Sequence, residues 1–210
     1  RSYVEALASG YRDSVVFNSN IKTIVRRQNE ITVLTEDGQR YDFDKIVLAC
    51  NADQALGLLD SPTSEEKRLL GAWRFNERRH VVHRDYSSFP KKPLIQGYNF
   101  LYTDRDGVLS GSVNGGSWHE PGVSGKCDLI NSQDPNFPIA PDLVEFETTF
   151  RTPVYDFRSF STIEQLPSLN GIQDTYSCGS YFGLGLHDDA VRSAVEVARI
   201  LNVEFWGTQT

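Results

Sequence analysis

No segment of this sequence is apolar over about 18 residues, so nothing in it predicts a membrane-spanning helix. Cysteine is scarce: the three cysteines, Cys50, Cys127 and Cys178, are far apart and form no C-x-x-C pair. They predict reduced thiols in a cytoplasmic protein rather than a disulfide framework or a metal site. Positive charge is also scarce, because 21 Lys and Arg stand against 28 Asp and Glu, a net charge of −7. The longest basic cluster is residues 78–80, which argues against nucleic acid as a partner.

What the sequence does contain is typical of a folded protein. Its 210 residues are 39% hydrophobic and 23% charged, enough for a core in one large domain or two small ones. Residues 1–8 already have a helical pattern, although no residue caps that helix and the chain contains no methionine and no signal-peptide pattern. We therefore expect the chain to be a piece of a longer polypeptide.

The N-terminal part of the sequence alternates between β-branched runs and turns. Strands are predicted at residues 14–17, 21–25, 31–35 and 40–43, with a hairpin at Asp37-Gly38 because both residues tolerate a positive φ. Residues 45–50 form an almost continuous apolar run, which is typical of a central parallel strand buried on both faces. The pattern predicts an antiparallel meander that leads into a buried strand.

Helices and further strands are predicted for the rest of the chain. Helices are expected at residues 53–59 and 63–73, the second with a capping box and with Trp73 and Phe75 fixing it to the core. Strands are expected at residues 79–85, 94–101, 108–113 and 174–178, and a short helix at 142–150 inside a loop-rich stretch. A last helix is expected at residues 189–201, where apolar residues recur every three or four positions.

The best functional signal is the glycine-rich turn before the last helix. Gly179, Gly183 and Gly185 let the backbone bend sharply and approach a flat ligand, and the free N–H groups of the helix point toward it. Asp188 stands where a dinucleotide fingerprint has its third glycine, and two carboxylates would repel a pyrophosphate. The turn therefore favours a polar but uncharged acceptor such as a ring carbonyl. The same pattern also fits an ordinary turn that binds nothing.

These segments, in this order, resemble a known family. The buried residues 46–50, the following residues 51–56 and the stretches 178–180 and 185–194 are similar to the C-terminal half of the flavin-containing amine oxidase and phytoene desaturase superfamily. The nearest similarity is to bacterial flavoproteins described as predicted NAD/FAD-binding oxidoreductases. The resemblance covers nearly the whole chain and is weakest at residues 115–166.

The resemblance implies eight residues that contact FAD: Ile21 at the adenine; Ala49 and Cys50 near the adenosine and pyrophosphate; Gly179 and Ser180 beside the ribitol and pyrophosphate; and Gly185, Leu186 and His187, whose backbone N–H groups face the flavin pyrimidine carbonyl. In many relatives an acidic residue follows the glycine, so Ser180 is a departure from the family pattern. No lysine, histidine or acid matches a transferable catalytic motif, and no catalytic residue is assigned.

The family's N-terminal strand, its G-x-G-x-x-G turn and its ribose-binding acid do not occur in this sequence. The resemblance therefore implies an α/β (α+β) fold that is the C-terminal half of a two-domain flavoprotein. Residues 1–60 and 168–210 would form a partial FAD-binding domain, and residues 61–167 a mostly antiparallel substrate-side domain. Without the other half, we expect weak or absent FAD binding, apolar surface exposed along residues 46–48 and 191–201, and self-association or pairing with the other half.

The implied function of the parent protein is FAD-dependent oxidation of a small organic substrate, with hydride transfer from a C–N or C–C bond to the flavin. The alternative is a non-catalytic fragment or binding module that uses an aromatic-lined cavity. The candidate aromatic residues are Tyr98, Tyr102, Trp118 and Tyr155, which could equally be ordinary core.

Other polar groups give weaker signals. His80 and His83 lie three residues apart in a predicted strand, so they face opposite sides and cannot share a metal. The acids at His119-Glu120 and Asp188-Asp189 are typical of solvated helix caps.

Overall fold

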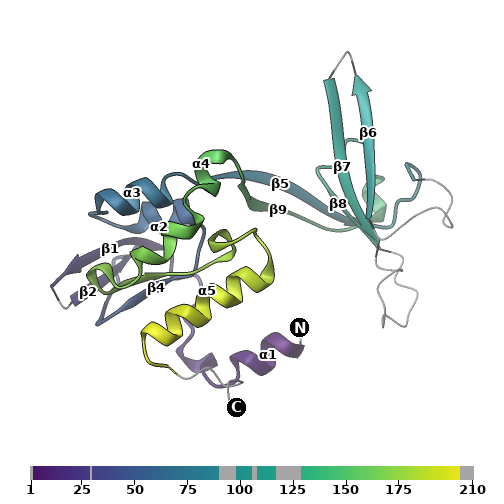
Figure 1. Ribbon diagram of the computed structural model, residues 1–210. Helices are drawn as coiled ribbons and strands as arrows, with labels where there is room; N and C mark the ends of the chain where they lie inside the picture. Colours follow the sequence, from purple (N-terminus) through teal and green to yellow (C-terminus); the bar gives the residue numbers. More distant parts are fainter. Residues whose placement is uncertain (1, 29, 90–97, 106–107, 117–128, 204–210) are drawn as a thin grey trace, which may run out of the picture. The chain divides into compact units, whose positions relative to one another are not determined.

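The computed structural model describes residues 2–28, 30–89, 98–105, 108–116 and 129–203 (Figure 1). The chain divides into two compact units: residues 1–74 with 153–210, and residues 75–152. The first unit is thus built from both ends of the chain, and the second is inserted between them. Residues 61–74 and 153–167, which the sequence analysis assigns to the substrate side, lie in the first unit. The roles of the two domains stay a prediction.

The first unit contains a three-stranded meander and a two-stranded parallel sheet with helices around them. Its elements are α1 (Ser2–Ala8), η1 (Arg12–Ser14), β1 (Ile21–Arg27), β2 (Glu30–Thr35), β3 (Arg40–Phe43), β4 (Ile46–Leu48), α2 (Ala52–Leu58), α3 (Ser64–Leu70), α4 (Phe157–Phe160), η5 (Ile163–Leu169), η6 (Ile172–Asp174), β10 (Thr175–Ser177), η7 (Ser180–Phe182) and α5 (His187–Ile200). This mixed α/β content confirms the predicted fold class, and the opening and closing helices lie where the sequence predicts them.

The meander follows the sequence prediction with one correction. Strands β1, β2 and β3 pair antiparallel in that order, and the predicted hairpin turns at Gly38 with a φ of +84°. Residues 14–17, however, form the end of a 3₁₀ turn and a loop rather than a strand. Val16 and Phe17 are 61% and 78% exposed, because none of the described segments pairs with them.

The predicted buried strand is shorter and more exposed than expected. Strand β4 pairs parallel with β10, with Leu48 opposite Ser177, as a parallel-type strand should. Only Leu48 is buried, whereas Val47 is 42% exposed. The reason is that β4 has β10 along one edge and no strand along its other edge within the described part of the chain. The prediction of burial on both faces is therefore wrong for this chain.

Helix α5 covers one face of the parallel pair. Tyr176 and Cys178 form a buried cluster with Val197, and the partly buried Leu201 packs against it. Two large apolar residues of the helix are exposed, Val191 at 56% and Ile200 at 50%.

A buried ion pair joins the meander to a helix. Arg26 of β1 binds both carboxylate oxygens of Glu66 in α3, at 2.5 and 2.9 Å, and also reaches the carbonyl of Ser61 at 3.0 Å. The two side chains are only 2% and 4% exposed. Burial alone would raise the pKa of Glu66, but hydrogen bonds from Arg26 and Thr63 outweigh it and lower that pKa. The Thr63–Glu66 capping box that the sequence predicts is present. Glu66 therefore serves both as a capping residue of α3 and as the partner of Arg26.

The second unit carries a five-stranded sheet in the order β6-β7-β8-β5-β9. Its elements are β5 (Arg74–His83), β6 (Tyr98–Arg105), β7 (Val108–Gly116), β8 (Ile130–Gln133), η4 (Pro141–Leu143) and β9 (Val144–Val154). The predicted helix at residues 142–150 is wrong. Pro141 and Asp142 start a single 3₁₀ turn, and the Thr- and Phe-rich residues after it form β9, as β-branched and aromatic residues favour. Strand β8 was not predicted.

Candidate functional site

The two parallel strands of the first unit end side by side. The N–H of Cys178 donates to the carbonyl of Leu48 at 3.2 Å, which continues the pairing by one step. The chain therefore leaves β4 at Ala49 and Cys50 next to the point where it leaves β10 at Gly179. Ligands of open α/β sheets bind beyond the carboxyl ends of the strands, so this edge is the candidate site.

Gly179 is held by the last helix. Its N–H donates to Ser193 Oγ at 3.0 Å, and this hydroxyl lies 2.8 Å from the carbonyl of Ala190. A Cβ on Gly179 would lie 2.8 Å from the ring of Tyr181, so glycine is needed there for close packing. These contacts fix the predicted residues Gly179 and Ser180 against the first turns of α5. Ser193 is not among the residues predicted for the site, because it gives no signal beyond being a small polar residue on an otherwise apolar stripe.

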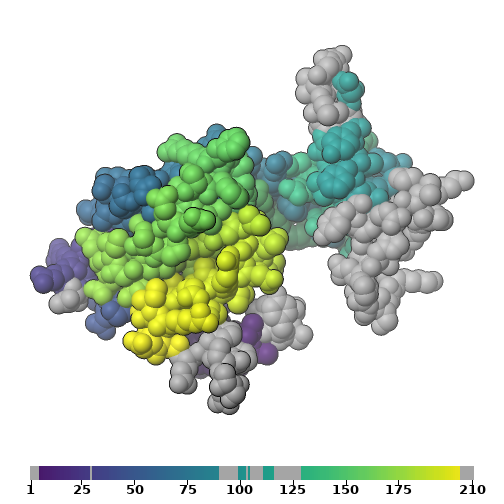
Figure 2. Space-filling view, in the orientation of Figure 1, coloured from purple at the N-terminus to yellow at the C-terminus, as the bar shows by residue number. Residues whose placement is uncertain are grey.

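The glycine-rich turn then brings the chain back to the start of α5. Gly185 has a φ of +88°, and its N–H donates to the carbonyl of Ser180 at 3.1 Å. A Cβ at Gly185 would lie 2.8 Å from the hydroxyl of Tyr155. Leu184 and Leu186 are 64% and 61% exposed, and Figure 2 shows this C-terminal segment, in yellow, at the surface. The turn is therefore both sharply bent and accessible.

Two of the three predicted N–H donors are already engaged within the chain. The N–H of Gly185 is used by Ser180, and that of Leu186 donates to Asp189 Oδ2 at 3.1 Å. The N–H of His187, the first residue of α5, has no acceptor among the described residues. The geometry thus reduces the predicted set to one free donor at the helix start. Asp189 is a cap, as expected, but its side chain is only 14% exposed rather than solvated.

Ile21 lies apart from this turn. It is the first residue of β1, pairs with Thr35, and lines a pocket of about 330 Å³ together with residues of β3 and β4, including Phe43 and Val47. Its predicted contact with an adenine stays a prediction.

An aromatic cluster lies beside the glycine-rich turn. Trp73 packs edge-on against Tyr155 and Tyr181, with ring centroids 5.3 and 5.6 Å apart. Burial and the nearby charge of Asp189 raise the pKa of Tyr155 to about 12, so its hydroxyl stays protonated. Of the other predicted aromatics, Tyr102 is 64% exposed in the second unit, while Trp118 and the side chain of Tyr98 lie outside the described residues.

The cysteines and histidines offer no metal site in the described ranges. Cys50 and Cys178 are free thiols whose pKa values are raised by burial, which lowers their reactivity. No group of three His, Cys, Asp or Glu in the described residues is placed to hold a metal. Cys127 and residues 119–120 lie outside that part of the chain.

One serine–histidine pair in the second unit resembles a nucleophile and its base, but the hydrogen bond between the two side chains runs in the opposite direction. His83 Nε2 lies 2.8 Å from Ser132 Oγ, and His83 Nδ1 accepts the backbone N–H of Asp85 at 3.1 Å. Nδ1 is therefore unprotonated, and Nε2 donates to the serine instead of taking its proton. Burial lowers the pKa of His83, so the pair is a neutral hydrogen bond in the core.

The buried His83 predicts a pH-dependent stability of the second unit. Because its pKa is lower in the folded state than the ordinary 6.5, the unfolded chain binds more protons below that value, and stability falls as the pH drops from about 7 to about 5. Urea unfolding at several pH values, followed by signals from the second unit, measures this fall. His83→Asn is expected to reduce the dependence and His80→Asn to leave it. An equal pH dependence in both variants would contradict the assignment.

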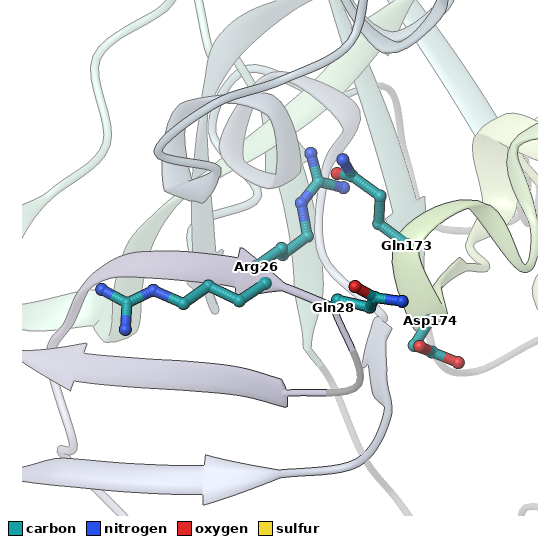
Figure 3. Close-up of a pocket in the computed structure, with 5 residues that line it drawn as sticks. Arg26, Gln28, Gln173 and Asp174 are labelled. Atoms are coloured by element: carbon teal, nitrogen blue, oxygen red, sulfur yellow. The ribbon is translucent and has the colours of Figure 1, made fainter.

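A second pocket lies at the opposite end of the parallel strands. It measures about 360 Å³ and is lined by the end of β1 and by Gln173 and Asp174 (Figure 3). Two of its three charged side chains are already matched, because Arg26 binds Glu66 and Lys45 binds Asp174 at 2.9 Å, and the third, Arg27, is exposed. The pocket also lies away from the carboxyl ends of the parallel strands, so it is not the candidate site.

Known proteins share this fold and part of this sequence. Residues 1–83 match the family described as flavin containing amine oxidoreductase. Among solved structures, the chain is similar to putrescine oxidase bound to putrescine (TM-score 0.59, 12% identity, 93% of this chain and 51% of that one). It is also similar to cyclohexylamine oxidase from Brevibacterium oxydans IH-35A (TM-score 0.56, 12% identity, 93% of this chain and 51% of that one). A third similar structure is a fatty acid isomerase from P. acnes that produces CLA (TM-score 0.53, 14% identity, 88% of this chain and 47% of that one). No curated protein matches the sequence.

The comparisons confirm the predicted resemblance to flavin-containing amine oxidases, by sequence over residues 1–83 and by fold over most of the chain. The chain is amine oxidase-like, and FAD is the cofactor of the family that it resembles. It spans about half the length of the solved structures that it matches. In the described residues, no helix has the length and apolar character needed to cross a membrane.

Proposed function

We propose that this chain is one half of an FAD-dependent oxidoreductase that oxidises a small organic substrate, an amine or a C–C bond, by hydride transfer to the flavin. The observation that carries the proposal is the start of α5: a free N–H at His187, a glycine with a positive φ at Gly185, and the nearby ends of two parallel strands. These features suit an uncharged ring carbonyl, because the carboxylates of Asp188 and Asp189 in the first turn of the helix disfavour an anion.

The residues present fit the ring end of FAD better than its pyrophosphate. When bound, FAD supplies the electron acceptor; the chain's own groups bind and orient it. The His187 N–H would hold the ring carbonyl, and Gly179 and Gly185 would let the backbone approach closely. Tyr155, which remains protonated with a pKa of about 12, would flank the ring as a neutral aromatic wall. The predicted contacts of Ile21, Ala49, Cys50 and Ser180 remain part of this proposal.

The same proposal includes a partner, the complementary half of the flavoprotein. The edge of β4 with which no described strand pairs can accept a further parallel strand, and the apolar pocket beside it is lined by Ile21, Phe43 and Val47. Parallel sheets are normally covered on both faces and are longer than two strands. A chain that spans half of its relatives and leaves such an edge open suits pairing with the other half, or with a second copy. Two free thiols support a reducing, cytoplasmic setting.

The alternative function, a non-catalytic binding module, is favoured by one other pocket. It measures about 380 Å³ and is lined by Tyr155, Asp156, Phe157 and Phe160. Phe157 and Phe160 are 98% and 55% exposed, so two large apolar side chains lie together at the surface of this pocket. A visible spectrum separates the two functions, because bound oxidised flavin is yellow and a binding module is colourless.

Titration of FAD, followed by quenching of flavin fluorescence, tests the proposal. For the 210-residue chain alone we expect a dissociation constant weaker than about 1 μM, near −8.2 kcal/mol, because the charge-assisted contacts to pyrophosphate and ribose lie in the other half. In a protein that joins both halves we expect stoichiometric flavin. Gly185→Val is expected to remove it, since a β-branched residue resists a positive φ and meets Tyr155.

The control is Gly57→Val, where an added Cβ meets no atom within 4 Å; it should keep the flavin. Submicromolar binding by the chain alone would show that this half suffices. Full flavin content in a folded Gly185→Val protein would refute the assignment of the turn.

A further inference from the structure

The carboxylate of Asp189 is built into the glycine-rich turn. Its Oδ2 accepts the N–H of Leu184 at 2.8 Å and that of Leu186 at 3.1 Å. Its Oδ1 accepts Arg192 Nη2 at 2.6 Å. One side chain therefore closes the turn on one side and pairs with the next turn of α5 on the other.

The position of this carboxylate requires a glycine at residue 183. A Cβ at Gly183 would lie 2.1 Å from Asp189 Oδ1 and 2.8 Å from Arg192 Nη2. The φ of Gly183 is −153°, outside the left-handed region, so the requirement argued here comes from the space that the carboxylate fills. The sequence signal, a glycine six residues before an acid at the third position of a helix, is weak by itself. In the structure, the carboxylate of Asp189 fills the space that a side chain at Gly183 would need.

The charge of Asp189 also reaches the site. The N–H groups of Leu186 and Leu184 hold its pKa below the ordinary value, and its charge contributes to the raised pKa of Tyr155. A carboxylate held in place, with the exposed Arg192 as its counter-ion, therefore occupies the positive end of α5, where a helix otherwise attracts a negatively charged ligand.

We propose that Asp189 is a positioning residue that sets the charge preference of the site. It occupies the N–H groups of Leu184 and Leu186, leaves that of His187 for the ligand, and disfavours additional negative charge beside the helix start. This inference rests on the proposed flavin site. For a flavin, the consequence is a lower reduction potential, because reduction adds negative charge to the ring and charges near the ring tune it.

Two neighbouring acids are expected to affect the site differently. Asp189 and Asp188 carry the same charge and are adjacent in the first turn of α5. Asp188 is exposed and its side chain makes no hydrogen bond to the described residues, so solvent screens its charge. Asp188→Asn is therefore a matched control for Asp189→Asn.

The first measurement uses the 210-residue chain without flavin. Hydrogen exchange of the Leu184 and Leu186 amides is expected to accelerate about tenfold in Asp189→Asn, since about 1.4 kcal/mol of hydrogen bonding is a factor of ten. Asp188→Asn should exchange like the wild type. Gly183→Ala keeps the charge of Asp189 but displaces its carboxylate from the turn, so it should accelerate exchange as well. Unchanged exchange in both Asp189→Asn and Gly183→Ala would overturn the proposal.

The second measurement is the reduction potential of the flavin in a protein that joins both halves. Asp189→Asn is expected to favour the reduced form about tenfold, an upward shift of about 30 mV for a two-electron couple, with a smaller shift in Asp188→Asn. Accelerated exchange without a larger potential shift in Asp189→Asn would show a merely structural role and overturn the proposal. Wild-type protein that binds no flavin would instead refute the proposed function, and the exchange data would still judge the contacts of Asp189.

Discussion

Replacing Glu66 by alanine is expected to destabilise the first unit by about 3–5 kcal/mol, because it leaves the charge of Arg26 buried without a partner. The Arg26 side chain is 2% exposed, and once Glu66 is gone its remaining partners among the described residues are the Ser61 carbonyl and the Thr175 hydroxyl. The loss also removes the acceptor of the Thr63 N–H at the start of α3. Urea unfolding with a signal from the first unit measures the change.

The same helix offers a matched control. Glu65 pairs with Arg68, but the two side chains are 53% and 49% exposed, and exposed pairs contribute little. Glu65→Ala is therefore expected to unfold close to the wild-type midpoint. If both alanine variants were equally mild, the buried pair would not be the link between meander and helix. Replacing Arg26 and Glu66 together by apolar residues should restore part of the loss, because no unpaired charge remains.

The second large effect is expected at Trp73. Its side chain is 3% exposed, its ring contacts Tyr155 and Tyr181, and its Nε1 donates to Thr162 Oγ1 at 3.1 Å. Trp73→Ala should cost about 3–5 kcal/mol, from lost burial and the remaining cavity. Trp73→Phe keeps a ring and loses the hydrogen bond, so it should cost less. Thermal and urea unfolding of the two variants give the comparison.

Phe157→Ala is the surface counterpart of this test. With 98% of its side chain exposed, its removal should change the unfolding free energy by no more than about 0.5 kcal/mol. Because Trp73 supports Tyr155 beneath the glycine-rich turn, Trp73→Phe should also weaken flavin retention more than Phe157→Ala does. A Trp73→Ala protein with nearly wild-type stability would contradict the packing described above.

The parts of the fold that the sequence predicted correctly are those specified by local chemistry. Gly38 marks its hairpin because the turn needs a positive φ, and Thr63 with Glu66 marks a helix start because the two side chains satisfy each other's backbone N–H. The final helix follows from its apolar period. The strand–turn–helix of the candidate site was predicted from its glycines for the same reason.

The errors arise where partners distant in the sequence decide the outcome. Residues 45–50 read as a strand buried on both faces, yet Val47 is exposed because β4 lacks a second neighbour among the described segments. Residues 142–150 carry a helix-start signal that lasts for one 3₁₀ turn before pairing in a sheet takes over. In the site, no sequence pattern reveals that Asp189 uses the N–H of Leu186, since that depends on how tightly the turn closes.

The division of the first unit between both ends of the chain has a consequence for biosynthesis. Lys45 and Asp174, which pair beside the parallel strands, are 129 residues apart in the sequence. At a synthesis rate of about 5–20 residues per second, a ribosome takes roughly 6–26 s to make that interval. During this time β4 has emerged without β10, while the inserted residues 75–152, which form a separate compact unit of the finished structure, are being made. The nascent chain therefore carries an open apolar strand edge for seconds, and this edge is where we expect chaperones to bind and premature release to cause aggregation.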